Sequence, residues 1–174
     1  MEPAALRAAV AAREPVDARE AASVSRFLRE LDRLRRPFDE HADPVHVTAS
    51  AIVTGPRGTV LHLHKRLGLW LQPGGHIDPR DHGWEEPWEA ALREAAEETG
   101  LAVAHPAAGP RLVHVDVHPG PKGHTHLDVR YLLEADGDPA PGEGESRDVR
   151  WFAWDDALAV ADPGLSGALA ALRP

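Results

Sequence analysis

The 174-residue sequence contains no cysteine, and this absence excludes a disulfide framework and thiol chemistry. It also has no apolar run near the roughly 18 residues that a membrane-spanning helix needs. The N-terminus lacks the apolar core of a secretory signal, so we expect a cytoplasmic location.

Positive charge is scarce as well, because 19 Lys and Arg residues stand against 28 Asp and Glu residues, for a net charge of −9. Proteins that bind nucleic acids or anionic membranes need clustered Lys and Arg, so we expect neither partner. A chain of this length makes one domain, or one domain with an extension. Six glutamates and one arginine lie within residues 84–98, so much of the acidity is concentrated in one short segment.

This acidic segment has the features of a helix that ends at Gly100, a residue suited to a helix C-terminus. Glu94, Glu97 and Glu98 fall within an arc of roughly 100° on such a helix. A solvated surface is the ordinary explanation of a Glu-rich helix. The glycine pair Gly74-Gly75 just upstream favours a second explanation, since it lets the backbone approach a ligand. Crowded carboxylates suit a hard divalent cation, which prefers oxygen ligands.

The run Arg93-Glu94-Ala95-Ala96-Glu97-Glu98-Thr99-Gly100-Leu101 follows Glu85 after seven residues. This pattern resembles the signature box of the Nudix hydrolases, Gly-x5-Glu-x7-Arg-Glu-U-x-Glu-Glu-x-Gly-U with U aliphatic. The resemblance covers residues 75–101 and departs from the family at one spacing. Nine residues separate Gly75 from Glu85, about four more than in the family, and we expect residues 76–84 to form a longer loop.

The resemblance implies a reaction in which water attacks phosphorus of a nucleoside diphosphate linked to another group, with Mg²⁺ or Mn²⁺ as cofactor. An NDP-sugar, an ADP-ribose-like compound, or a nucleoside triphosphate (NTP or dNTP) would be the substrate, and a homodimer is a further expectation from the family. Implied metal ligands are Glu94, Glu97, Glu98 and a loop carbonyl of Gly74 or Gly75. Arg93 is expected to pair with Glu85, and Glu145 to supply a further ligand or the base.

Three residues near the box are candidates for contact with the substrate, namely His64, Arg66 and His76. Ordinary surface positions compete with that interpretation for each of them. The histidines are numerous, at 11, and several form i,i+2 pairs such as His124 and His126. A zinc cluster is one explanation. No pair has the spacing of a recognised zinc motif, so polar outward faces of strands are favoured.

Periodicity predicts helices over residues 3–13 and 18–36, followed from residue 44 by strands that alternate with period two. We therefore predict an α/β (α+β) protein: an N-terminal helical extension, 1–43, and a Nudix-type domain, 44–174, built as an α/β/α sandwich on a mixed sheet. Two functional alternatives remain open. One is a non-catalytic nucleotide-sensing module of the same fold, and the other is an interaction protein that acts through residues 18–36.

Overall fold

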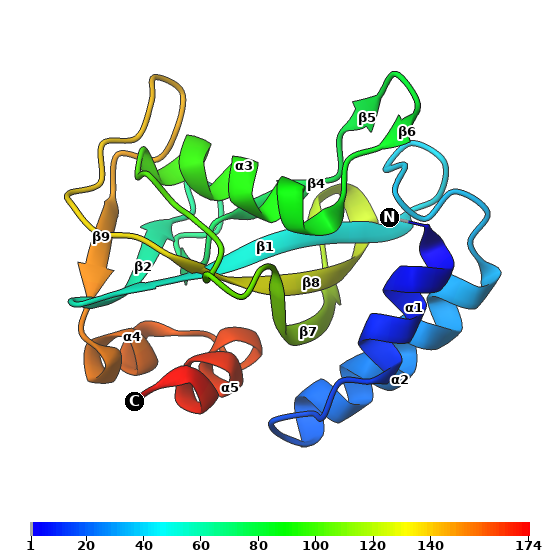
Figure 1. Cartoon of the computed structure of the whole chain (residues 1–174), viewed down its shortest axis with the longest axis horizontal. Coiled ribbons are helices and arrows are strands. Elements are labelled where there is room, and N and C mark those ends of the chain that lie inside the picture. Colours follow the sequence, from blue (N-terminus) through cyan, green and yellow to red (C-terminus); the bar gives the residue numbers. More distant parts are fainter. Residues whose placement is uncertain (1) are drawn as a thin grey trace.

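The computed structural model describes residues 2–174 and shows a mixed sheet between layers of helices (Figure 1). None of the helices in that described range is both long and apolar enough to cross a membrane. In chain order, the helices are α1 (Pro3–Ala11), α2 (Ala18–Arg33), α3 (Pro87–Thr99), α4 (Trp154–Val160) and α5 (Pro163–Leu172). The strands are β1 (Val45–Gly55), β2 (Gly58–Leu63), β3 (Trp70–Leu71), β4 (Gly74–His76), β5 (Pro79–Arg80), β6 (Gly83–Trp84), β7 (Arg111–Pro119), β8 (Thr125–Glu134) and β9 (Val149–Phe152).

The seven-stranded sheet runs in the order β3-β2-β1-β8-β7, with β4 also paired to β1 and β9 to β2. Its central pair, β1 and β8, is parallel, whereas β7 and β8 form an antiparallel hairpin. Helix α3 covers one face, and α4 and α5 lie on the other (Figure 1). This arrangement confirms the predicted α/β/α sandwich on a mixed sheet.

Both faces of β1 are buried, although the two faces differ in chemistry. Val47, Ala49 and Ala51 belong to the large apolar core that also includes the inner side of α3. His46, Thr48 and Ser50 project from the opposite face, because successive side chains of a strand alternate, and they are buried too. The alternating pattern predicts the strand correctly, but its polar side lies inside the protein.

Local signals fix the ends of α3. Pro87 occupies the first turn, and a capping box joins Glu86 and Glu89 at the helix start. Gly100 ends the helix with a φ of 66°, a left-handed conformation that glycine adopts without strain. The buried side carries small residues such as Ala91 and Ala95, which allow the helix to lie close to the sheet.

The N-terminal helices share the core of the sheet. Leu6 of α1 and Phe27 of α2 are both fully buried in the same apolar cluster as the strands. Asp17 caps α2 by accepting from the Glu20 N–H at 2.8 Å. The Glu20 side chain does not complete a capping box. It is buried, and it accepts from the Val16 and Val115 N–H groups at 2.7 and 3.0 Å, which ties α2 to β7.

One predicted segment differs from the structure. Residues 76–84, expected as a loop, contain the small antiparallel pair β5 and β6. The hairpin places Arg80 within 3.0 Å of Glu85, so the extra residues fold back on the start of α3.

Candidate active site

Two glutamates of α3 lie against the glycine pair of β4. Glu98 accepts a hydrogen bond from the Gly74 N–H at 2.9 Å. A Cβ on Gly75 would collide with the carboxylate of Glu94, so glycine is needed for this close approach. Both glutamate side chains are only 18% exposed. The backbone of β4 and the carboxylates of α3 therefore form one compact, oxygen-rich corner.

Arg93 connects this corner to the start of the helix. Its guanidinium donates to Glu85 at 2.6 Å, to Glu94 at 2.7 Å and to the carbonyl of His76 at 3.1 Å. Glu85 is 1% exposed and also accepts from the Asp78 N–H at 2.8 Å. The side chain of Arg93 thus fixes a buried carboxylate, the end of β4 and one of the two inner glutamates at the same time.

The carboxylates of this corner repel one another. Burial raises the pKa of Glu98 to about 8, and the negative charges of Glu94, Glu145 and Glu97 add to this effect. The hydrogen bond from the Gly74 N–H lowers the pKa but does not offset the rise. Burial also raises the pKa of Glu94, although Arg93 opposes that shift. A divalent cation would remove this repulsion and hold both carboxylates ionised.

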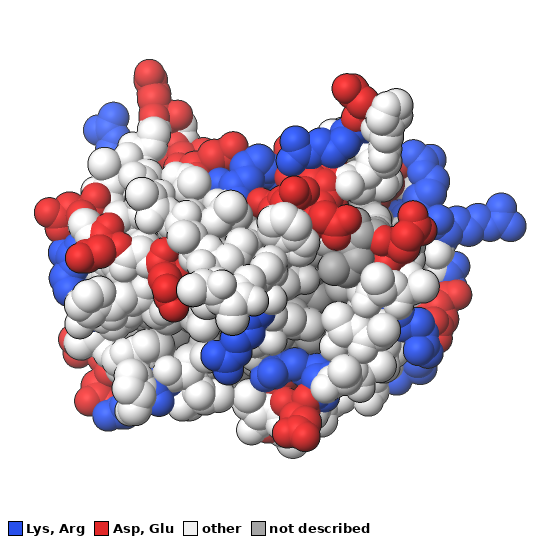
Figure 2. Space-filling model, viewed as in Figure 1, with Lys and Arg blue, Asp and Glu red and all other residues white. Residues whose placement is uncertain are grey.

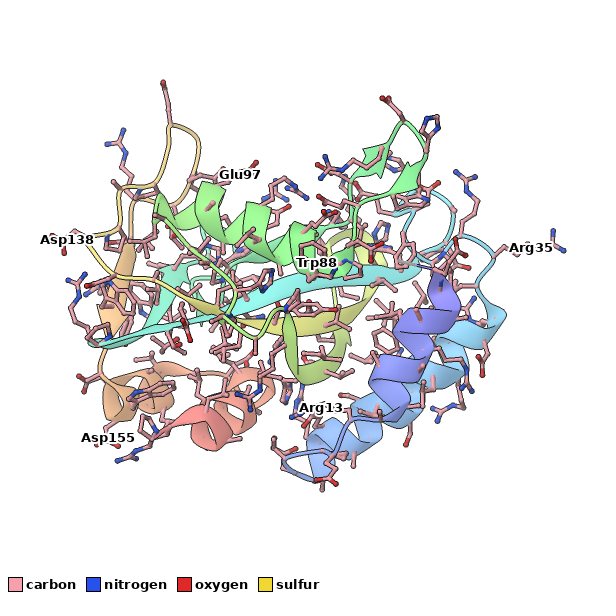
Figure 3. The ribbon with its side chains drawn as sticks, viewed as in Figure 1. Arg13, Arg35, Trp88, Glu97, Asp138 and Asp155 are labelled. Carbon is pink, nitrogen blue, oxygen red and sulfur yellow. The ribbon has the colours of Figure 1, made fainter. Side chains whose placement is uncertain are left out.

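The remaining candidate residues are arranged around this corner at different depths. Glu97 points away from the sheet, on the opposite side of α3 from Trp88 (Figure 3), and its side chain is 57% exposed. Figure 2 shows acidic and basic side chains interleaved along the surface over α3.

Glu145 lies on the β8–β9 connection, and with His64 it lines a hollow of about 480 Å³. Arg66 is exposed.

A cavity of about 550 Å³ opens beside the carboxylates. Glu98 and the glycine pair form part of its wall, together with His64 and His76. Arg66, Glu94 and Glu97 are not among its lining residues. The structure therefore brings Gly74, Glu94, Glu98 and His76 together, whereas Glu97 and Arg66 remain on the outer surface.

Another part of the cavity wall is formed by a buried network of charged residues, to which the sequence alone assigns no role. Asp128 accepts from Ser50 at 2.7 Å and from Arg130 at 3.0 Å. Arg130 also reaches Asp116 at 3.4 Å, and all three charged residues are at most 3% exposed. Burial opposes ionisation of Asp116, but His118 and the positive charges of Arg130 and Arg19 hold its pKa well below the usual range.

A sequence signal for this network does exist. Polar residues recur at every second position of two segments that form a hairpin, 114–118 and 126–130. The interpretation of such positions as outward and solvated is wrong for His46, His62 and His114, which are at most 6% exposed. Both faces of the sheet are covered, so the polar face becomes an interior wall.

The donor set of the corner fits a hard divalent cation. Glu94 and Glu98 offer carboxylate oxygens, the Gly74-Gly75 segment offers backbone carbonyls, and the absent Cβ of Gly75 leaves the space that carboxylate ligation requires. Mg²⁺ and Mn²⁺ prefer such oxygen ligands. When bound, such an ion supplies positive charge to phosphoryl oxygens and lowers the pKa of a bound water.

Comparison with known proteins agrees with this geometry. The family model of the NUDIX domain matches residues 44–172, which is more than half of the chain. A NUDIX-family hydrolase from Clostridium perfringens is similar with a TM-score of 0.60 and 27% identity, over 74% of this chain and 98% of that one. A MutT NUDIX hydrolase from Burkholderia pseudomallei gives a TM-score of 0.55 and 28% identity over the same shares, 74% and 98%.

A C. elegans Ap4A hydrolase is similar in fold alone, with a TM-score of 0.58 and 19% identity over 71% of this chain and 92% of that one. The family match covers the acidic helix, the glycine pair and the entire sheet. The chain therefore belongs to the Nudix family of hydrolases.

Proposed function

We propose that this protein is a Mg²⁺- or Mn²⁺-dependent pyrophosphohydrolase that cleaves a small nucleoside diphosphate derivative. The observation that carries the proposal is the junction of Glu94 and Glu98 with the Gly74-Gly75 backbone, where Glu98 and the glycine pair line a cavity of about 550 Å³. A cavity of this volume suits a nucleotide-sized molecule. Phosphoryl transfer depends mainly on positioning and on electrostatic stabilisation, and this corner can provide both.

Each residue of the corner has a proposed role. Glu94 and Glu98 hold the cation, with a carbonyl of Gly74 or Gly75 as a further ligand. Arg93 is a positioning residue, because it fixes Glu94 and the His76 carbonyl through its bonds to both. Glu97, on the solvent side of the same helix, would complete the ligand set for an ion at the cavity mouth.

The water-activating base is proposed to be Glu145. Its charge is close enough to contribute to the raised pKa of Glu98, and it lies on a connection that borders the site. His64 lines both this hollow and the main cavity, and this position supports a role for it in holding a substrate phosphate between the two. His76 is proposed to contact the substrate from the other end of the glycine pair.

Arg66 is also kept as a proposed phosphate contact. Its exposed side chain carries a positive charge beside His64, and its backbone N–H lies 3.3 Å from Nδ1 of that ring. A substrate that extends out of the cavity toward this turn would meet that charge. Arg66→Ala should then raise KM and leave kcat nearly unchanged, whereas an unchanged KM would remove Arg66 from the site.

A substrate panel tests the function. The full-length protein is incubated with Mg²⁺ or Mn²⁺ and with NDP-sugars, ADP-ribose-like compounds and nucleoside triphosphates in ¹⁸O-labelled water, and products are identified by mass. We expect a nucleoside monophosphate or an equivalent phosphate product, with the label on phosphorus. Label on carbon, or binding without turnover across the panel, would contradict the proposal, and the second result would favour a nucleotide-sensing module.

Matched variants separate the site from the rest of the acidic surface. Glu98→Gln and Glu94→Gln should lower kcat by about 10²–10⁴-fold, because each removes a charge that neutralises the cation. Glu143→Gln changes an exposed acid of the β8–β9 connection and should leave kcat within about twofold. Equal losses in all three variants would show that the rate does not depend on this corner.

A further inference from the structure

Three histidines converge from three different strands beside the cavity. His46 and His126 are direct partners in the parallel register of β1 and β8. His76 ends β4, where it faces Thr48 of β1 in the antiparallel register. The ring centroids of His46, His76 and His126 lie 5.2–5.5 Å apart.

The Nε2 atoms of these rings are suited to bind a metal ion. The Nε2 atoms of His46, His76 and His126 are all buried, and no hydrogen bond reaches any of them. The Nδ1 atom of His46 lies 3.3 Å from the carbonyl oxygen of Asp43, which can accept a hydrogen bond from an Nδ1–H group. A proton on Nδ1 leaves the lone pair on Nε2, as in histidines that bind metals.

The distances suit a transition metal. One ring nitrogen from each histidine lies within 4.8 Å of the other two. Tetrahedral zinc, with Zn–N bonds of about 2.0–2.1 Å, places its nitrogens about 3.4 Å apart, so each ring must move inward by less than about 1 Å. Beside this group, a carboxylate oxygen of Glu40 lies 3.3 Å from Nε2 of His76.

The surroundings of the rings also suit a metal. Histidine binds metal ions through a neutral ring nitrogen, and the burial of these nitrogens disfavours the charged form. Gly120 closes the site from the side of the β7–β8 loop, because a Cβ there would collide with the ring of His126.

We propose that His46, His76 and His126 form a binding site for Zn²⁺ or a similar transition metal ion, separate from the glutamate corner. With the ion bound, His76 would hold the metal instead of contacting the substrate directly. Imidazole nitrogens favour such ions, whereas the all-oxygen corner favours Mg²⁺ or Mn²⁺. An ion at the histidine site fastens the end of β4 to β1 and β8. Because β4 also carries Gly74 and Gly75, zinc would hold the glycine pair in place.

Metal content tests the proposal without reference to activity. The full-length protein is treated with a chelator, loaded with Zn²⁺, desalted and analysed for bound zinc. We expect one tightly held zinc per chain, and a zinc-dependent rise in the melting temperature. Co²⁺ in place of Zn²⁺ should give the intense visible absorption of a tetrahedral site. His76→Ala and His126→Ala should each weaken zinc affinity by about 100-fold or more, since even the loss of an outer-shell partner costs about 10–100-fold.

Two controls locate the ion. His82→Ala removes an exposed histidine of the β5–β6 turn and should leave zinc binding unchanged. The double variant Glu94→Gln/Glu98→Gln should keep its zinc while losing Mg²⁺-dependent hydrolysis. An anomalous difference map of zinc-loaded wild-type crystals decides the matter even where a histidine variant misfolds. A peak among the glutamates alone, or zinc content unaffected by His76→Ala and His126→Ala, would overturn the proposal.

Discussion

Arg93 donates to both carboxylate oxygens of Glu85, from Nη2 at 2.6 Å and from Nε at 3.3 Å. Burial by itself would favour the neutral acid, but Arg93 and the Asp78 N–H hold the pKa of Glu85 below its usual value. The pair therefore stabilises the fold at neutral pH. This contribution is lost as the pH falls below the ordinary carboxyl range and through the folded-state pKa.

Arg93→Ala should destabilise the protein by about 3–5 kcal/mol, because it leaves the buried charge of Glu85 without its main partner. Urea denaturation at pH 7 measures the change. Arg80→Ala is the matched control: Arg80 also reaches Glu85, but its side chain is 56% exposed, so the expected loss is below about 1 kcal/mol. Equal losses of stability in the two variants would show that the two hydrogen bonds of Arg93 to Glu85 stabilise the protein no more than the contact of Arg80.

Metal affinity should depend on pH through Glu98. Because the pKa of Glu98 is raised to about 8, an incoming cation must displace its proton at lower pH. Mn²⁺ affinity, measured by electron paramagnetic resonance, should rise by up to about tenfold per pH unit from about pH 6 to about pH 8 and then level off. Glu98→Gln should flatten this slope, whereas Glu143→Gln should preserve it. A flat profile in the wild type would contradict the assignment of Glu98.

Gly75→Ala should impair catalysis more than folding. The added Cβ would collide with the end of the Glu94 side chain, which is flexible and can move aside. A displaced carboxylate no longer fits the cation, and misplacement by about 1 Å can cost about 10²-fold in rate. Steady-state kinetics and thermal melting measure the two effects. Gly142→Ala, at an exposed position with open space around it, should change neither.

Glu20→Ala should weaken the attachment of α2 to the sheet. It leaves the Val16 and Val115 N–H groups without their acceptor, at a cost of about 1–3 kcal/mol for each that stays buried. Exposed Glu14 provides the control, and Glu14→Ala should change stability by less than about 0.5 kcal/mol. Melting curves of both variants decide whether the N-terminal helices are part of the cooperative unit.

Local signals were enough to predict α3 and its carboxylates. Pro87, Gly100 and the spacing of the glutamates all act within a few turns of one helix. Which glutamates face inward could not be predicted, since that depends on how α3 rotates against the sheet. Glu97 and Glu98 are adjacent in sequence, yet one side chain is 57% exposed and the other 18%.

The histidine site was beyond sequence reasoning for a different reason. His46 and His126 are far apart in the chain, and only the register of β1 on β8 makes them neighbours. Alternation shows that a strand has two faces, but it does not show which face meets water. The hairpin β5–β6 was missed because strands of two residues are too short to carry a periodic signal.

The parallel pairing of β1 with β8 also governs how the protein can fold. Thr48 and its partner Asp128 are 80 residues apart, and the whole of α3 lies between them. The middle of the sheet therefore cannot close until most of the chain has left the ribosome. Closing so long a loop is entropically costly and slow. Nascent chains that end before β8 leave one edge of β1 without its hydrogen-bonding partner, which makes them natural clients for chaperones.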